Sequence, residues 1–275
     1  QGTGASTNVF TITPSTNTAY AGSFTLTFRA SDGVNIATAP ATFTLQFSVS
    51  NSRYTSSLIT SVGANNAVNN SFDDKSTSDH TITANGNITQ TTFSPYASGG
   101  YSYFFDGSGD YLEIDDGTWL TLGNGNFCFE TWIYNTATTG GSQYIFGQGN
   151  SAGQANSISA EMYINSNRTL TGGIYVGSQK YATSTGTIPT NTWTHVAVTR
   201  SGSTVRLFVN GSQVDSGTWS YTHRDSSLSV TIGASSDGGY DFTGKISNVR
   251  VIKGTALYTS SFTPPTAPLT NITNT

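Results

Sequence analysis

Apolar and polar residues alternate along much of the chain, which is the pattern of half-buried β-strands. In WTHVAVTR (193–200), Val196 and Val198 alternate with polar neighbours, and TVRLFV (204–209) repeats the pattern after a Ser-Gly-Ser turn. Because successive side chains of a strand point to opposite faces, each run buries one face. Asn210-Gly211 then turns the chain again, since both residues tolerate positive φ. The stretch predicts a β-meander.

Similar runs recur along the chain, separated by Gly, Asn, Asp and Ser, and no stretch has helical periodicity. Short strands between turn residues are typical of an all-β sandwich. The first strand of the large sandwich is expected near residues 57–62, after a linker that begins at residue 50. The final segment, TPPTAPLTNITNT (263–275), has prolines and no period, which predicts an extended tail along the surface.

The first 50 residues form a separate pattern. FTLTFRAS (24–31) and TFTLQFSV (42–49) alternate strictly, and NVFTIT (8–13) adds a third candidate strand. An immunoglobulin-like sandwich needs about seven strands, so three cannot close one. The segment resembles the last strands of immunoglobulin-like or cadherin-like repeats. We expect residues 1–50 to be a partial β segment of this kind, or to pack on the main domain or a neighbouring subunit, and residues 51–275 to form the large domain.

The composition excludes several classes of partner. Charged residues make up 9% of the chain and the net charge is −4, which disfavours nucleic acid and anionic membranes as partners. No apolar run reaches the roughly 18 residues of a membrane span. A single cysteine excludes an intrachain disulfide. The chain begins at Gln1 without a signal-peptide pattern, so we expect a processed chain or a piece of a longer one.

The order of the motifs resembles one protein family. The series is FFDGSGDYLEI (104–114), FCFETWIY (127–134), WTHVAVTRSGSTVRLFVNG (193–211) and LSVTIGASSDGGYDFTGKISNVRVIKGTALY (228–258). It resembles the laminin-G and pentraxin-like branch of the concanavalin A-like jelly rolls. The resemblance implies a jelly-roll sandwich of two antiparallel sheets, and it does not specify a ligand.

A narrower resemblance is carried by SRYTSSLI (52–59), HTITANGNITQTTFSPY (80–96) and VIKGTALYTSSFTPPTAPLT (251–270). These segments resemble the versions of the domain found in virion proteins of marine tailed phages, notably cyanophages, where it follows immunoglobulin-like repeats in fibres or appendages. Bacterial surface proteins use the same modules. The resemblance implies a virion-surface or extracellular location, and homo-oligomers or contacts with other virion or filament subunits.

The glutamates do not form the pattern of a glycoside hydrolase, an activity that some concanavalin A-like folds have. Such enzymes need two carboxylates about 5 Å apart, or a wider pair for inversion. The chain has three glutamates, Glu113, Glu130 and Glu161, and none has a carboxylate two residues away within a strand. Asp115 and Asp116 follow Glu113 in a turn-like DDGT. We predict no catalytic residues.

Other reactive side chains are also interpreted as structural. The three histidines are scattered along the sequence, and His195 inside the meander is expected to be packed and hydrogen-bonded. Cys128 lies between Phe127 and Phe129, which predicts a buried, inert thiol. No His and Cys spacing matches a zinc site.

Aspartates make calcium a candidate cofactor, because calcium binds carboxylate and carbonyl oxygens. Asp106 and Asp110 lie in FDGSGDY, and Asp237 and Asp241 lie in SSDGGYD. The resemblance implies that these two motifs are neighbours in space, so the four carboxylates are a candidate metal site. The alternative is that each Asp bonds the backbone of its own Asp-Gly turn.

Loop aromatics are candidates for sugar binding, because aromatic faces stack on apolar sugar faces. Trp219, Tyr221, His223 and Arg224 cluster in GTWSYTHRDSS (217–227), and Tyr240 lies in a Gly-rich loop. The alternative for the Trp219 loop is edge-strand packing or a subunit contact. Trp132 and Trp193, in core-like strands, are interpreted as packing, and Trp119 is ambiguous.

These observations favour a non-catalytic attachment module that recognises host surface polysaccharide through weak contacts multiplied by avidity. A purely structural virion or appendage module without a sugar ligand is the second hypothesis. The third is a bacterial adhesin or filament subunit, in which the first 50 residues complete a partner's sheet.

Overall fold

The computed structural model describes residues 22–28, 41–47, 54–61, 72–96, 100–114, 117–138, 140–149, 160–175, 179–220, 222–223, 226, 228–236 and 238–272. The chain divides into two units, one of Gln1–Asn51 with Thr273–Thr275 and one of Ser52–Ile272. Each unit is described by itself.

The first unit contains a β-hairpin. Strands β1 (Gly22–Phe28) and β2 (Ala41–Phe47) pair antiparallel, with Phe24 opposite Leu45 and Leu26 opposite Phe43. These are two of the alternating runs that predicted strands. The third predicted strand, residues 8–13, lies outside the described residues, so the immunoglobulin-like interpretation stays a prediction.

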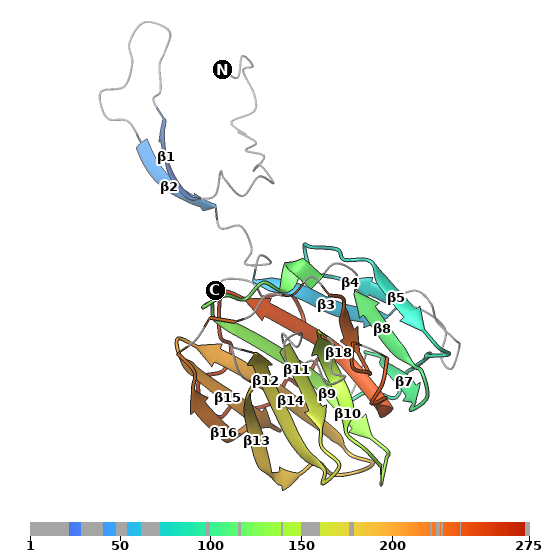
Figure 1. The fold of residues 1–275 in the computed structure, drawn as a ribbon. Coiled ribbons are helices and arrows are strands. Elements are labelled where there is room, and N and C mark those ends of the chain that lie inside the picture. The colour runs from blue at the N-terminus through green and yellow to red at the C-terminus, as the bar shows by residue number, and fades with distance from the viewer. Residues whose placement is uncertain are drawn as a thin grey trace, which may run out of the picture. The chain divides into compact units, whose positions relative to one another are not determined.

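The second unit is a sandwich of two antiparallel sheets (Figure 1). The nine-stranded sheet has the order β16 (Ser212–Thr218), β15 (Thr204–Val209), β14 (Trp193–Ser201), β9 (Phe127–Asn135), β18 (Thr243–Lys253), β3 (Thr55–Ser61) and β4 (Phe72–Asp74), while β7 (Ser102–Asp106) pairs β18 and β6 (Thr89–Thr91) pairs β7. The seven-stranded sheet has the order β13 (Gln179–Thr187), β12 (Thr169–Tyr175), β11 (Ala160–Ile164), β10 (Gln143–Gln148), β17 (Val230–Ile232), β8 (Tyr111–Ile114) and β5 (Ile82–Asn85). Among the described residues the helical structure is a 3₁₀ turn, Gly117–Leu120, which agrees with the missing helical period.

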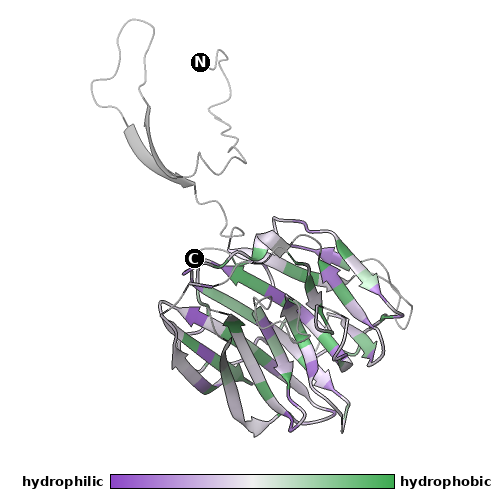
Figure 2. Ribbon diagram, viewed as in Figure 1, coloured by the Kyte–Doolittle hydropathy of each residue, from purple (hydrophilic) through white to green (hydrophobic). Residues whose placement is uncertain are grey.

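The core lies between the sheets and is built from alternate strand residues. The rings of Phe127 and Phe129 on β9 stack at 4.8 Å between centroids, and Phe129 stacks on Phe146 of β10 at 4.9 Å. This second contact joins the two sheets. Burying each such side chain is worth about 1.5–3 kcal/mol. Hydrophobic and hydrophilic residues accordingly alternate along the strands in Figure 2.

The predicted meander is present as β14, β15 and β16. Val196 pairs with Val209 and Val198 with Leu207, so both runs bury the same face. The turn to β16 uses positive φ at Asn210 (48°) and Gly211 (76°), as the Asn-Gly pair predicts.

The C-terminal segment after β18 covers part of the outer face of the nine-stranded sheet. Tyr258 and Phe262 stack at 3.5 Å, and Phe262 contacts His195 of β14 at 5.6 Å between centroids. Thr199 Oγ1 donates to the carbonyl of Tyr258 at 2.8 Å. The segment after Lys253 contains no regular element in its described part, up to Ile272, and it is packed rather than loose.

Beneath this segment lies a buried charge network. Glu130, which is 1% exposed, accepts from Arg250 Nε and Nη2 through Oε1 at 2.9 and 2.6 Å. Its Oε2 lies 3.1 Å from His195 Nε2 and accepts from Tyr258 OH at 2.8 Å. Burial alone would raise the pKa of Glu130, but His195 and Arg250 outweigh it and hold the pKa below its usual range. The predicted packing of His195 is confirmed.

Two further expectations concern single features. Cys128 is fully buried, as predicted, and burial raises the pKa of its thiol. In the described part of the chain, no helix has the length and apolar character needed to cross a membrane.

Candidate functional site

The two predicted aspartate motifs lie next to each other. Asp106 on β7 is opposite Thr243 on β18. Gly109 N donates to Asp241 Oδ2 at 3.1 Å, which ties the loop after β7 to the loop before β18. The neighbourhood that the family resemblance implied is therefore present.

The described aspartates act mainly as turn acceptors. Asp110, 1% exposed, accepts from Asn87 N at 2.7 Å and from Asp106 N at 2.9 Å. Asp106 Oδ1 accepts from Ser108 N at 2.8 Å. Calcium takes six to eight oxygens, and no three His, Cys, Asp or Glu gather as a metal-binding group in the described ranges. Asp237 lies outside the described residues, so the four-aspartate site as a whole stays a prediction.

The loop around Trp219 is packed where the prediction needed exposure. Trp219 is 6% exposed, belongs to the hydrophobic core and donates from its backbone N to Ser203 O at 2.6 Å. His223 is 2% exposed and its backbone N donates to Gly123 O at 2.9 Å. Neither ring offers a free face to a sugar, so for these two residues the packing alternative replaces the binding interpretation. Tyr221 and Arg224 lie outside the described residues.

Tyr240 is the predicted ligand-binding residue that the structure places at a cavity on the surface. Its side chain is 54% exposed. It lines a cavity of about 270 Å³ together with Asp241, Gln143 and Gly107. We call this cavity the tyrosine pocket. Its volume lies just below the range of about 300–1,000 Å³ for ligand pockets, which suits one sugar ring.

Local backbone geometry fixes the tyrosine pocket. Tyr240 has a left-handed φ of 54°, a conformation that costs a non-glycine residue about 1–3 kcal/mol. Tyr240 O accepts from Tyr144 N at 2.9 Å, and the next apolar residue, Phe242, is fully buried. Gly107 lies so close to Thr243 that a Cβ on it would be 2.3 Å from Thr243 Oγ1. The ring of Tyr240 is thus directed outward by the anchoring of its neighbours.

Two polar groups complete the tyrosine pocket. Asp241 Oδ1 is buried and has no hydrogen-bond partner, although Oδ2 accepts from Gly109. Gln143 Oε1 accepts from Asn135 Nδ2 and Thr243 N, each at 2.9 Å. These bonds hold the amide group and leave its Nε2 without a partner in the described structure. The pocket therefore presents an aromatic face and an amide donor, with the Asp241 carboxylate in its wall.

Tyr240 also ends a row of tyrosines. Its ring lies 5.8 Å from that of Tyr144, which stacks on Tyr163 at 4.9 Å. Tyr144 OH donates to Glu161 Oε2 at 2.6 Å. Burial, and then the charge of Glu161, raise the pKa of Tyr144, so its hydroxyl stays a proton donor at neutral pH.

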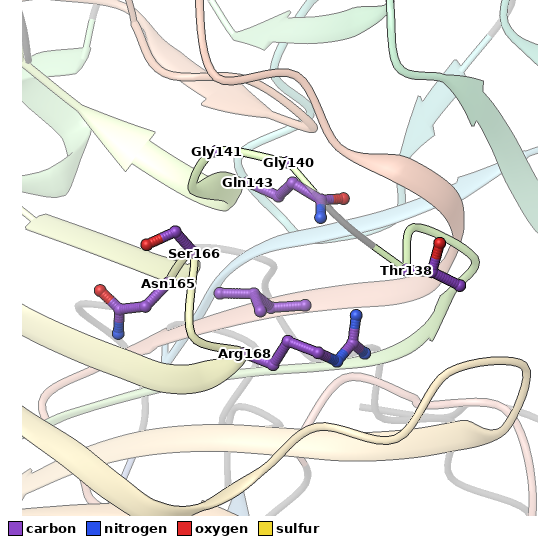
Figure 3. A pocket seen from close by; sticks show the side chains of 8 residues that line it. Thr138, Gly140, Gly141, Gln143, Asn165, Ser166 and Arg168 are labelled. Carbon is purple, nitrogen blue, oxygen red and sulfur yellow. The ribbon is translucent and has the colours of Figure 1, made fainter.

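A smaller cavity shares lining residues with the tyrosine pocket, and Figure 3 shows the side chains around it. It measures about 10 Å³, room for one water, and shares Gln143 and Gly141 with the pocket. Arg168 at its edge donates to Ala137 O and, from Nε and Nη2, to Ile188 O. Arg168 therefore fixes the loop that carries one wall of the tyrosine pocket.

The glutamates are too far apart for the hydrolase pattern. Glu113 and Glu161 share a cross-strand row, but β17 and β10 lie between their strands. Three strand spacings put them about 14 Å apart, beyond the limit of about 9.5 Å for an inverting pair. Glu130 lies in the other sheet, bound by Arg250. The three glutamates form no catalytic pair.

Sequence reasoning missed Gln143 as a pocket residue. Its signal was weak, a polar residue two positions after Gly140-Gly141 at the start of a buried strand. Its partners, Asn135 and Thr243, come from two other strands.

The fold and the site define a jelly-roll sandwich with a surface pocket at its loop end. The chain belongs to the concanavalin A-like lectin/glucanases superfamily, whose sequence pattern matches residues 106–257, more than half of the chain. The predicted fold class is confirmed. Comparison with curated proteins gives no match.

Solved structures share this fold at low identity. A structure of botulinum neurotoxin type C, described by its cell entry through two ganglioside molecules, has a TM-score of 0.57 at 13% identity, covering 75% of this chain and 49% of the other. The binding domain of botulinum neurotoxin DC matches in complex with SialylT (TM-score 0.55, 12% identity, 75% and 49% covered). The same domain with rat synaptotagmin II matches with a TM-score of 0.56 at 13% identity and the same coverage. The chain spans about half the length of these structures, and the likeness shows the fold alone.

Proposed function

We propose that the second unit is a non-catalytic carbohydrate-recognition domain that binds sugar in the tyrosine pocket. The observation that carries the proposal is the 54% exposed ring of Tyr240 beside the unpaired Oδ1 of Asp241. An aromatic ring can stack on the apolar face of a sugar, while a few placed polar groups fix its orientation. Gln143 supplies a donor for sugar hydroxyls, and the Asp241 carboxylate lies in the wall of the same pocket.

Two further facts support a sugar ligand. The superfamily is described by lectins and glucanases, and two of the matched toxin structures are described with gangliosides or SialylT. The separation of the three glutamates supports recognition without cleavage.

The proposed context is an attachment module of a virion fibre or another extracellular protein, with host surface polysaccharide as partner. The support is the sequence resemblance of residues 52–59, 80–96 and 251–270 to virion proteins. A single shallow pocket gives weak binding, and homo-oligomers would raise the avidity. A bacterial adhesin or filament subunit is the alternative context.

A glycan array with the purified chain tests the proposal. Tyr240→Ala removes the stacking face and is expected to weaken any bound neutral glycan at least about tenfold, with an unchanged melting temperature. Tyr101→Ala removes a 39% exposed aromatic ring outside the tyrosine pocket and serves as the matched control. Neutral-glycan binding that survives Tyr240→Ala would refute the pocket assignment. A blank array would favour the structural module.

A further inference from the structure

A second candidate site lies on the outer face of the nine-stranded sheet. Lys245 on β18 pairs with Phe104 on β7 and with Tyr134 on β9, and Tyr134 pairs with Trp193 on β14. The neighbours Ile246 on β18, Ile133 on β9, and Tyr103 and Phe105 on β7 are buried in the core. Because strand side chains alternate, the row of Phe104, Lys245, Tyr134 and Trp193 faces away from the core.

Phe93 lies against this row and turns it into a groove. Its ring centroid is 5.0 Å from that of Tyr134 and 5.6 Å from that of Trp193, and its side chain is 48% exposed. Thr89 and Thr91 of β6 line the same hollow, which has a volume of about 440 Å³. We call this hollow the lysine groove. An exposed Phe in contact with two other aromatic rings is unusual for a solvated surface and offers a flat apolar face.

The charge in the lysine groove has no anionic partner among the residues that the structure describes. Lys245 Nζ lies 4.6 Å from the ring centroid of Phe104 and 5.9 Å from that of Phe93. Within the described residues no carboxylate forms an ion pair with it; the ion pairs there are Lys75–Asp73, His80–Asp74, His195–Glu130 and Arg250–Glu130. Contact with ring faces leaves the N–H groups of Lys245 able to donate to an anion. Partial burial lowers the pKa of Lys245, which strengthens the case that this ammonium lacks a counter-charge.

We propose that the lysine groove binds a uronic acid residue of an acidic polysaccharide. The sugar carboxylate pairs with Lys245 Nζ, and the apolar face of the pyranose ring lies on Phe93 and Tyr134. The Thr89 hydroxyl is in reach of the ring hydroxyls. This ligand combines one negative charge with an apolar face and hydroxyl groups, which are the features that the groove presents.

Charge favours a uronate over a densely sulfated chain. The groove contains one cation, and the protein carries a net charge of −4. Many negative charges on a ligand would be repelled by the protein, whereas one carboxylate per sugar matches one lysine. The lysine groove is distinct from the tyrosine pocket, so its ligand does not depend on the function proposed there.

Calorimetry with three trisaccharides tests the proposal on the full chain: trigalacturonic acid, its methyl ester and a sulfated galactan trisaccharide. The acid is expected to bind at least about tenfold more tightly than the ester, because the ester lacks the charge. Lys245→Met should abolish this difference, and Lys245→Arg should keep most of it. Lys75→Met, at a lysine already paired with Asp73, should leave it unchanged.

Three outcomes would overturn the proposal. They are equal binding of acid and ester, a preference that survives Lys245→Met, and tighter binding of the sulfated sugar than of the uronate. If Lys245→Met does not fold, Lys245→Arg and salt dependence decide. Affinity for the acid that does not fall between 0.05 and about 0.5 M salt excludes an exposed ion pair.

Discussion

Replacing Arg250 by methionine tests how the C-terminal segment is held on the sheet. Arg250 makes two bonds to Glu130 Oε1 and a third, from Nη1, to Thr270 O at 2.6 Å. Methionine fills a similar volume and cannot donate. The variant would leave the Glu130 carboxylate in the interior with His195 and Tyr258 as its remaining partners.

The size of the effect follows from burial. Removing one partner of a buried ion pair costs about 3–5 kcal/mol, because the other charge stays desolvated. The side chains of Arg250 and Glu130 are 9% and 0% exposed, so solvent screens this pair little. For a domain of 150–250 residues each kcal/mol lowers the melting temperature by about 2–4 °C. Arg250→Met is therefore expected to lower it by about 6–20 °C.

Thermal and urea unfolding followed by circular dichroism measure this loss. Lys75→Met is the control, since the Lys75–Asp73 pair is 52% and 38% exposed and such pairs contribute at most about 1 kcal/mol. The double variant Glu130→Met with Arg250→Met removes both charges and should recover part of the stability. If Arg250→Met melts within about 2 °C of Lys75→Met, the reasoning about burial is refuted.

Two further outcomes are expected. Burial raises the pKa of Asp74, but hydrogen bonds from Leu58 N and Ser76 N outweigh it and hold the pKa below its usual value, as His195 and Arg250 do for Glu130. Groups with a lowered pKa in the folded state stabilise the fold above about pH 4 and lose this contribution as pH falls. The melting temperature should therefore drop below about pH 4, and it should drop less steeply in Asp74→Asn. A melting temperature that does not change with pH would contradict this. Adding calcium or a chelator should leave the melting temperature unchanged, since the described aspartates bond backbone N–H groups. A rise of several degrees with calcium would support the four-aspartate site instead.

The strands could be predicted from the sequence because their signals are local. The alternation in residues 193–209 and the Asn210-Gly211 turn specify β14, β15 and β16 without information from elsewhere in the chain. The burial of Trp219 could not be predicted from such a local signal. Trp219 follows a polar, glycine-containing strand end, and its burial comes from a core assembled from distant strands.

The exposure of Tyr240 and the lysine groove depend on long-range pairing. Tyr240 points outward because Phe242 is anchored in the core and Tyr144 bonds its carbonyl. Lys245 meets Phe104 and Tyr134 because β18 pairs with both β7 and β9. Sequence periodicity gives the face of each residue but not the register between strands, so neither arrangement could be read from one segment.

The hydrogen bond from Ile272 N to Thr55 Oγ1, 3.1 Å long, brings the start of β3 and the end of the C-terminal segment to one point. Asn271 Nδ2 adds a bond of 2.7 Å to Lys75 O at the same place. Tension applied at Thr55 and Ile272 would load these two bonds first and would not stretch the sandwich along its sheets. The force would then peel the C-terminal segment off the sheet, and the contacts of Arg250 and Tyr258 would resist next. The phenylalanine core would be loaded only after these contacts had broken. The tyrosine pocket would therefore keep its shape under a load that has already detached the C-terminal segment.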